Sequence, residues 1–253
     1  MTLYVFGDSF ASTEVNPRWK INFVKQWSMI LSKKLGVELE NYGIGGSSLE
    51  YTYYKFNQIS ANLKEDDVVV IVLTDLLRKW IFKDRPVTSS LRAVETHADV
   101  DPNTIKHAQW YFATALNIEV EEVHLQNFLY AVNATTFHLK VKPLFICAFD
   151  TVSRGRWGID LNSFNQLPVN NFALGSLWEV SSYEITHPDN DPVNALRTYI
   201  QKEFRVNHMS EVQHDILADK ILNYIHNGTT VDLTTGFVKN IYKKQDLINK
   251  GIL

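Results

Sequence analysis

The sequence predicts an α/β protein built around a mostly parallel sheet. Residues 67–74 form a strand-like segment in which Asp67 is followed by a continuous run of β-branched and aliphatic side chains, which is typical of a strand buried on both faces. Residues 2–6 form a second, shorter run of the same kind, and Gly7 ends it. Stretches with helical spacing of apolar residues lie between the strand-like runs, which favours helices layered on one sheet.

The remaining elements are placed by periodicity and by capping signals. Helical spacing occurs in five stretches: residues 22–35, 49–63, 101–140, 191–204 and 211–225. The third should break around Leu116 and Asn117, and the last should begin at a capping box formed by Ser210 and Gln213. Further short strands are expected at residues 37–39, 144–149 and 177–185, with a long loop over residues 150–176. We expect a single domain over residues 1–253, with residues 228–253 as a peripheral tail.

Composition limits the class of protein. The chain has 253 residues, 45% of them hydrophobic and 21% charged, the balance of a globular protein with a sizeable core. Its net charge of −3 argues against a nucleic-acid partner. No signal peptide and no membrane-spanning run is recognisable, so we expect cytoplasmic synthesis and no membrane partner. The one cysteine, Cys147, lies in an apolar run and is expected to be an inert buried thiol.

The first candidate site follows the first strand, at Gly7-Asp8-Ser9. In open α/β sheets, ligands bind where parallel strands end. A serine on a tight turn there exposes its hydroxyl and places its own backbone N–H beside it, which suits acyl transfer. The simpler interpretation is a strand end with ordinary turn residues.

Two further segments should reach the same edge of the sheet. The turn at residues 41–48 contains Gly43, Gly45 and Gly46, so its backbone has positive φ or approaches another segment closely. It is either a plain strand–helix connection or a second N–H donor facing Ser9. Thr74 and Asp75 follow the strand at 67–74, and the mixed basic and aromatic residues up to position 99 either line a ligand cleft or pin a loop.

A histidine near the C-terminus completes a recognisable order. His208 comes just before the last helix. With the Ser9, glycine and Thr74-Asp75 segments, it resembles the four blocks of the SGNH (GDSL) hydrolases, a family of esterases and lipases with a flavodoxin-like three-layer α/β/α sandwich. The resemblance implies that Ser9 is the nucleophile, that Ser9 and Gly46 donate backbone N–H groups to the oxyanion, and that His208 is the general base.

Two positions depart from the family pattern. Thr74 stands where the family has an asparagine that completes the oxyanion hole, and Asp75 follows it as a supporting residue beside Asp8. The Thr74 hydroxyl is shorter than an amide, and losing one such donor typically costs about 10²–10³ in rate. Arg205 stands three residues before His208, where the family has the aspartate that orients the histidine.

A second assignment of the base restores a carboxylate. Glu184 and His187 have the spacing acid-x-x-His-Pro, so that Glu184 would orient His187. The separate helix start at Asp191-Pro192 fits this assignment less well, and both remain open. His214 is expected on the surface or packed within the last helix. The remaining histidines lack the spacing of metal ligands, so neither a metal nor a cofactor is expected.

Two main functions follow from the resemblance. The first is a serine esterase acting on a small-molecule or saccharide ester, with O-acetyl groups on a saccharide as one candidate substrate. The second is a catalytically degenerate binding or structural module on the same scaffold, for example in a phage virion. A homo-oligomer or a virion partner is left open by the sequence. A flavodoxin-like cofactor binder is disfavoured because the sequence has no phosphate-binding loop.

Overall fold

The computed structural model describes residues 1–13, 26–80, 101–151, 158–160, 171–183 and 209–239. Five parallel strands form one sheet in the order β2-β1-β3-β4-β5. The strands are β1 (Thr2–Phe6), β2 (Glu38–Asn41), β3 (Val68–Leu73), β4 (Lys142–Cys147) and β5 (Phe172–Ser176). The described helices are α1 (Trp27–Leu35), α2 (Leu49–Ser60), α4 (Pro102–Trp110), η1 (Tyr111–Ala115), α5 (Ile118–His138), α7 (Leu177–Tyr183) and α9 (Glu211–Asn227).

The central strand confirms the prediction of a parallel sheet. All six residues of β3 are buried, as expected for a strand covered on both faces. Leu3 of β1 pairs with Val68 on one side of β3, and Lys142 of β4 pairs with Val68 on the other. The strand order 2-1-3-4-5 is that of a flavodoxin-like fold, so the predicted fold class is confirmed.

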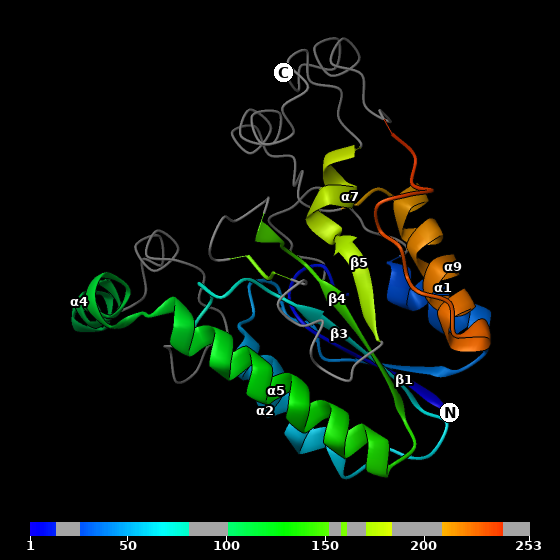
Figure 1. The fold of residues 1–253 in the computed structure, drawn as a ribbon, viewed down its shortest axis with the longest axis horizontal. Helices are drawn as coiled ribbons and strands as arrows, with labels where there is room; N and C mark the ends of the chain where they lie inside the picture. Colours follow the sequence, from blue (N-terminus) through cyan, green and yellow to red (C-terminus); the bar gives the residue numbers. More distant parts are fainter. Residues whose placement is uncertain (14–25, 81–100, 152–157, 161–170, 184–208, 240–253) are drawn as a thin grey trace.

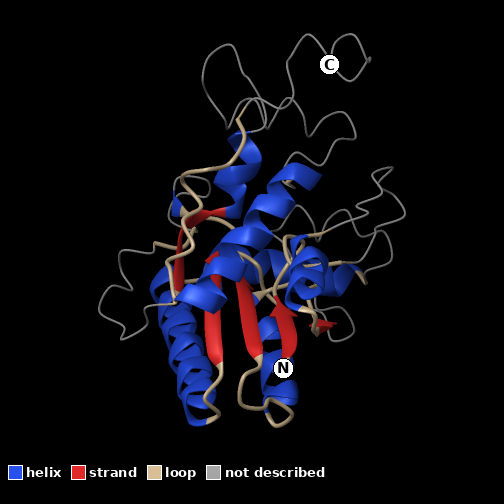
Figure 2. Cartoon of the chain, turned by 90° about the vertical axis from the view of Figure 1, so that its right-hand side faces the viewer, coloured by secondary structure: helices blue, strands red, loops and turns tan. Residues whose placement is uncertain are grey.

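Helices cover both faces of the sheet and make a three-layer sandwich (Figures 1 and 2). On one face α1 packs against α9, and their apolar side chains join the core cluster that includes Trp27, Leu31 and Leu217. On the other face α2 packs against α5, and Phe56 and Phe128 belong to a second cluster. The alternation of β3 side chains between the clusters (Val70 in the first, Ile71 in the second) follows the two-residue period of a strand.

The predicted helix starts and breaks are confirmed where the structure describes them. The Asp101 side chain caps α4 by accepting a hydrogen bond from the Thr104 N–H. Asn117 caps α5 after the expected break. Ser210 caps α9 by accepting a hydrogen bond from the Gln213 N–H at 3.5 Å. The helix expected at residues 191–204 lies outside the described residues.

The strand expected at residues 177–185 is wrong, because Leu177–Tyr183 is the helix α7. The strand of this region is β5, which lies within the stretch that we expected to be a loop. Ser176 explains the boundary, since its hydroxyl accepts a hydrogen bond from the Glu179 N–H at 3.2 Å. A serine followed three residues later by a glutamate is itself a helix-start signal, and it outweighs the strand-like residues that follow.

Part of the segment expected as a peripheral tail packs into the core. Val231 and Leu233 are buried. The Leu174 N–H donates to the Val231 carbonyl at 2.8 Å, and the Leu233 N–H donates to the Leu174 carbonyl at 2.7 Å. These bonds hold residues 231–233 beside β5. Among the described helices, none is long and apolar enough to cross a bilayer.

Candidate active site

The strand order places the predicted site at a topological switch point. β2 lies on one side of β1 and β3 on the other, and ligands of such sheets bind outside the carboxyl ends of the strands where the order reverses. The carboxyl end of β1 leads to Ser9, and that of β3 leads to Thr74 and Asp75. The structure therefore brings both predicted segments to the edge where this fold binds its ligands.

Ser9 lies in a tight turn that the backbone defines. Gly7 has φ +135°, and a Cβ there would come within 2.5 Å of the Val72 carbonyl oxygen, so only glycine fits between β1 and β3. The Ala11 and Ser12 N–H groups both donate to the Asp8 carbonyl, at 3.0 and 2.9 Å. The Ser9 residue is 6% exposed, and the turn holds it in a fixed place at the sheet edge.

The glycine-rich turn lies against the Ser9 turn. A Cβ at Gly43 would come within 2.8 Å of the Ala11 backbone, and one at Gly45 would lie 3.8 Å from the Ser9 Cβ. Gly46 has φ +81°, a conformation that disfavours other residues. The two turns are therefore packed together, and the second needs its glycines for this close approach.

Asp8 fastens the Ser9 turn to the end of β3. Its Oδ1 accepts a hydrogen bond from the Phe10 N–H at 2.9 Å. Its Oδ2 accepts one from the Thr74 hydroxyl at 3.2 Å and another from Arg78 Nη1 at 2.5 Å. The side chain is fully buried, and these donors compensate for its lost hydration. The Thr74 hydroxyl has one hydrogen, which this arrangement directs to Asp8.

Arg78 is the functional residue that sequence reasoning missed. Its side chain is only 8% exposed, and its Nε lies 3.8 Å from Asp75 Oδ2. Its guanidinium stacks on Phe149, 5.0 Å from the ring centre. Arg78 therefore pins the segment after β3 to Asp8. The one available signal was a basic residue, Arg78, three positions after Asp75, at the sheet edge where Asp8 was also expected.

The four residues that concern the general base, Glu184, His187, Arg205 and His208, lie outside the described residues. The described chain resumes at Met209, which is 1% exposed and belongs to the same core cluster as Phe10. Met209 thus anchors the start of the α9 segment in the core on this face of the sheet.

His214 is packed between α9 and α1. Its Nδ1 accepts a hydrogen bond from the Trp27 N–H at 3.3 Å, and Trp27 Nε1 donates to the Phe10 carbonyl at 2.8 Å. Burial lowers the pKa of His214 to about 4, since an imidazolium would lose its hydration there. A neutral, buried imidazole suits a structural role, and it matches the expectation that His214 packs within the last helix.

The described residues contain no group of three or more His, Cys, Asp or Glu side chains placed to hold a metal. Cys147 is fully buried, and burial raises the pKa of its thiol. The thiol is therefore protonated and unreactive at neutral pH.

No protein-family profile matches this sequence, and no curated protein sequence matches it significantly. The similar solved structures include the following two. One is a lipolytic protein of the G-D-S-L family from Desulfitobacterium hafniense DCB-2, with 14% identity, a TM-score of 0.40, and coverage of 75% of this chain and 82% of the other. The other is a member of the lipolytic protein G-D-S-L family from Veillonella parvula DSM 2008, with 12% identity, a TM-score of 0.32, and coverage of 63% and 64%. At these scores the likeness says nothing about the reaction.

Proposed function

We propose that this chain is a serine ester hydrolase of the SGNH type with Ser9 as its nucleophile. The observation that carries the proposal is the packing of the glycine turn against Ser9, with the Gly45 position 3.8 Å from the Ser9 Cβ. A serine and a glycine-rich backbone meet at the switch point of the sheet, where acyl transfer needs a nucleophile and N–H donors together.

The reaction proceeds through an acyl-enzyme. A histidine takes the proton of the Ser9 hydroxyl as its oxygen attacks the ester carbonyl. The backbone N–H groups of Ser9 and Gly46 donate to the resulting oxyanion. The bond between the acyl carbon and the alcohol oxygen then breaks, and the histidine gives its proton to that leaving oxygen. Water attacks the acyl group in the same way and frees Ser9.

Thr74 is the weakest of the three candidate oxyanion donors. Its hydroxyl serves the oxyanion only if it turns from Asp8 toward the substrate, because it donates to Asp8 Oδ2 in the structure. Asp8 and Asp75 support the site through Arg78, which links the Ser9 turn to the end of β3. Their role is to hold the nucleophile in place, since productive geometry tolerates little displacement.

His208 is the proposed general base, with His187 oriented by Glu184 as the alternative. His208 directly precedes Met209, which is buried in the core cluster that also contains Phe10. His208 also lies two residues before Ser210, the N-cap of α9, and this spacing to the last helix supports the choice of His208. The proposed substrates are small-molecule or saccharide esters, including O-acetylated saccharides. A phage-associated role remains part of the proposal.

The test is hydrolysis of p-nitrophenyl acetate by the native chain and by four variants: Ser9→Ala, His208→Ala, His187→Ala and Ser60→Ala. We expect Ser9→Ala to lose about 10³-fold or more in kcat, because the nucleophile is removed. One histidine variant should lose a similar factor and thereby identify the base. Ser60 lies at the exposed end of α2, so Ser60→Ala should keep full activity.

Covalent labelling tests the nucleophile independently of turnover. A fluorophosphonate should transfer its phosphonyl group to the Ser9 oxygen with loss of fluoride, and mass spectrometry of peptides should locate the adduct on Ser9. Native activity no higher than that of Ser9→Ala, on both p-nitrophenyl acetate and an O-acetylated saccharide, together with no label on Ser9, would overturn the proposal. The degenerate binding or structural module would then be the better description.

A further inference from the structure

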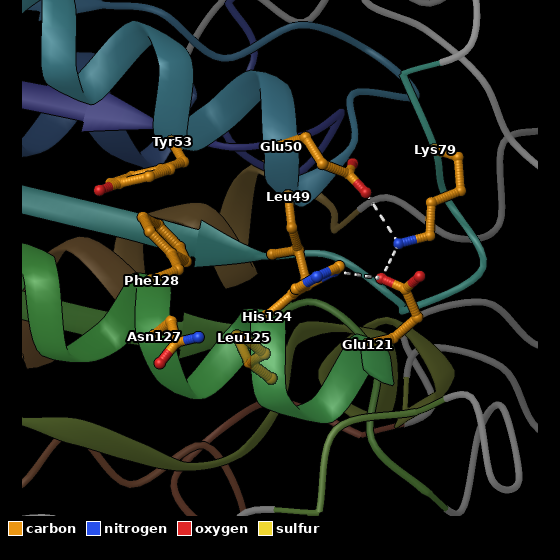
Figure 3. A pocket seen from close by; sticks show the side chains of 9 residues that line it. All are labelled: Leu49, Glu50, Tyr53, Lys79, Glu121, His124, Leu125, Asn127 and Phe128. Carbon is orange, nitrogen blue, oxygen red and sulfur yellow. Dashed lines mark hydrogen bonds and ion pairs between the residues drawn. The ribbon is translucent and has the colours of Figure 1, made fainter. Parts of the chain in front are cut away.

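A pocket of about 340 Å³ lies between α2 and α5, beside the segment that follows β3 (Figure 3). Its volume is within the range of small-molecule sites. The floor is apolar and aromatic, and one wall is ionic. The floor is formed by Leu49, Tyr53, Leu125 and Phe128, whereas Glu50, Lys79 and Glu121 form the wall.

Lys79 holds the ionic wall together. Its Nζ donates to Glu50 Oε1 at 2.7 Å and to Glu121 Oε2 at short range. Burial alone would lower the pKa of Lys79, but the two glutamates outweigh this effect and raise the pKa. Lys79 is therefore charged, and one positive charge faces two negative charges.

The two glutamates differ in their other hydrogen-bond partners. Glu121 Oε2 also lies 3.4 Å from His124 Nδ1, and its Oε1 accepts from the Tyr111 hydroxyl at 3.5 Å. Glu50 Oε2, in contrast, is shielded from solvent and has no hydrogen-bond partner among the described residues. A shielded carboxylate oxygen without a donor is costly, so Glu50 Oε2 offers an acceptor to a donor from outside the chain.

The net charge of the wall and the aromatic floor together indicate the chemical class of this external donor. The wall carries one excess negative charge. The N-terminal ends of α2 and α5, where Glu50 and Glu121 lie in the first turns, offset part of it but leave Glu50 Oε2 without a donor. The Tyr53 and Phe128 rings lie 5.3 Å apart, and aromatic faces attract organic cations. We propose that this pocket binds a small organic ammonium ion, with its N–H groups on Glu50 and its apolar body against Tyr53 and Phe128.

Other ligand chemistries fit the wall less well. An anion would meet the excess negative charge, and Lys79 has no free charge to offer because both glutamates already hold it. A neutral alcohol would satisfy Glu50 Oε2, but hydrogen bonds to a carboxylate from a charged donor are roughly twice as strong as those from a neutral one. The proposal concerns binding alone and does not depend on hydrolysis at Ser9.

The experiment compares three probes of similar shape by calorimetric titration at fixed ionic strength. The probes are 2-phenylethylammonium, 2-phenylethanol and 3-phenylpropionate. We expect the ammonium to bind about tenfold or more tightly than the alcohol, and the carboxylate to bind most weakly. In Glu50→Gln the shape of the side chain remains and the charge is lost, so the preference for the ammonium should disappear. Chemical-shift changes should map to Tyr53 and Phe128.

Glu65→Gln is the matched control. Glu65 also pairs with a lysine, Lys140 at 3.0 Å, but both side chains are largely exposed. This variant should bind all three probes as the native chain does. Equal or tighter binding of the alcohol or the carboxylate to the native chain, an unchanged preference in folded Glu50→Gln, or no saturable binding of the ammonium would each overturn the proposal. Circular dichroism confirms that each variant is folded.

Discussion

Arg78 and Lys79 are neighbours in the sequence, yet each serves a different ionic cluster. Arg78 binds Asp8 and Asp75 at the Ser9 turn, whereas Lys79 binds Glu50 and Glu121 between α2 and α5. We refer to these as the aspartate cluster and the glutamate cluster. Both contain one buried cation between two carboxylates, so their differences show what each arrangement is suited to do.

The aspartate cluster is closed to solvent, because the side chains of Asp8, Asp75 and Arg78 are 8% exposed or less. Asp8 is fully buried and accepts three hydrogen bonds, from Phe10, Thr74 and Arg78. The glutamate cluster is open, since the Glu50 side chain is 38% exposed and its Oε2 has no donor in the described part of the chain. A closed cluster fixes the geometry of the backbone around it, and an open one leaves an acceptor for a ligand. The first therefore suits positioning of Ser9, and the second suits binding.

Breaking the closed cluster should have the largest effect. Arg78→Met leaves Asp8 buried with its charge uncompensated, and removing one partner of a buried ion pair costs about 3–5 kcal/mol. We expect a loss of this size in the free energy of unfolding, measured by urea denaturation at pH 7. Arg78→Lys keeps a charge but not the fork of donors, so its loss should be smaller.

Asp8→Asn in the Arg78→Met background is the internal control. It removes the orphaned charge and keeps an oxygen for the Phe10 N–H. Its amide NH2 can donate to the Thr74 hydroxyl oxygen, so it should recover part of the lost stability. A loss below about 1 kcal/mol in Arg78→Met, or no recovery in the double variant, would show that the cluster does not hold the turn.

His214 offers a second comparison, because it is buried outside both clusters and burial keeps it neutral. Its pKa is lowered to about 4 in the folded chain, while the unfolded chain has an ordinary value near 6.5. Below pH 6.5 the unfolded chain binds a proton that the folded chain does not, so stability falls as the pH drops toward 4. The loss from this group amounts to about 3 kcal/mol.

The measurement is the free energy of unfolding between pH 4.5 and 7. The native chain should lose stability more steeply on acidification than His214→Gln, which has no group to titrate at this position. His138→Gln removes an exposed histidine and should leave the native slope unchanged. Parallel curves for the native chain and His214→Gln would contradict the assignment.

The two clusters also show which features of the structure can be predicted from the sequence and which cannot. The buried strand β3, the helix caps at Asp101 and Ser210, and the sheet-edge position of Ser9 follow from local patterns, because periodicity and capping are local properties. The divergence of Arg78 and Lys79 is not local. It depends on which side chains α2 and α5 bring near the end of β3, and these partners of Lys79 lie 29 and 42 residues away in the sequence.

The wrong prediction of a strand at residues 177–185, where the structure has the helix α7, has a different cause. Leu177–Tyr183 has residues that suit either a strand or a helix over so short a stretch. The decisive signal was the hydroxyl of Ser176 together with Glu179, a pattern that we used at Ser210 but not here. Neither explanation bears on the general base, since its candidates His187 and His208, with Glu184 and Arg205 beside them in the sequence, lie outside the described residues.

Removing the cation of the glutamate cluster should lower the free energy of unfolding less than removing the cation of the aspartate cluster. Lys79→Met leaves Glu121 buried without its cation, but the partly exposed Glu50 can turn to water. We therefore expect a loss of about 2 kcal/mol, below the range for fully buried pairs. Lys140→Met, which removes the exposed partner of Glu65, should change stability by less than about 0.5 kcal/mol. A loss in Lys79→Met as large as that in Arg78→Met would mean that the two clusters are equally closed.

The smallest effect is expected at Thr74, where two roles can be separated. If the hydroxyl chiefly supports Asp8, Thr74→Val should lower the free energy of unfolding by about 1–2 kcal/mol and lower kcat on p-nitrophenyl acetate less than tenfold. If it donates to the oxyanion during the reaction, kcat should fall by about 10²–10³. We expect the first result, because the single hydroxyl hydrogen is directed at Asp8 in the structure.

Thr136→Val is the matched control for that substitution. Thr136 is equally buried, but its hydroxyl donates to a neutral acceptor, the Val132 carbonyl at 2.8 Å in α5. Because hydrogen bonds to a charged group contribute more than those to a neutral one, Thr136→Val should destabilise the chain less than Thr74→Val and leave kcat unchanged. A fall of 10² or more in kcat confined to Thr74→Val would instead assign Thr74 to the oxyanion hole and make Asp8 only the resting partner of its hydroxyl.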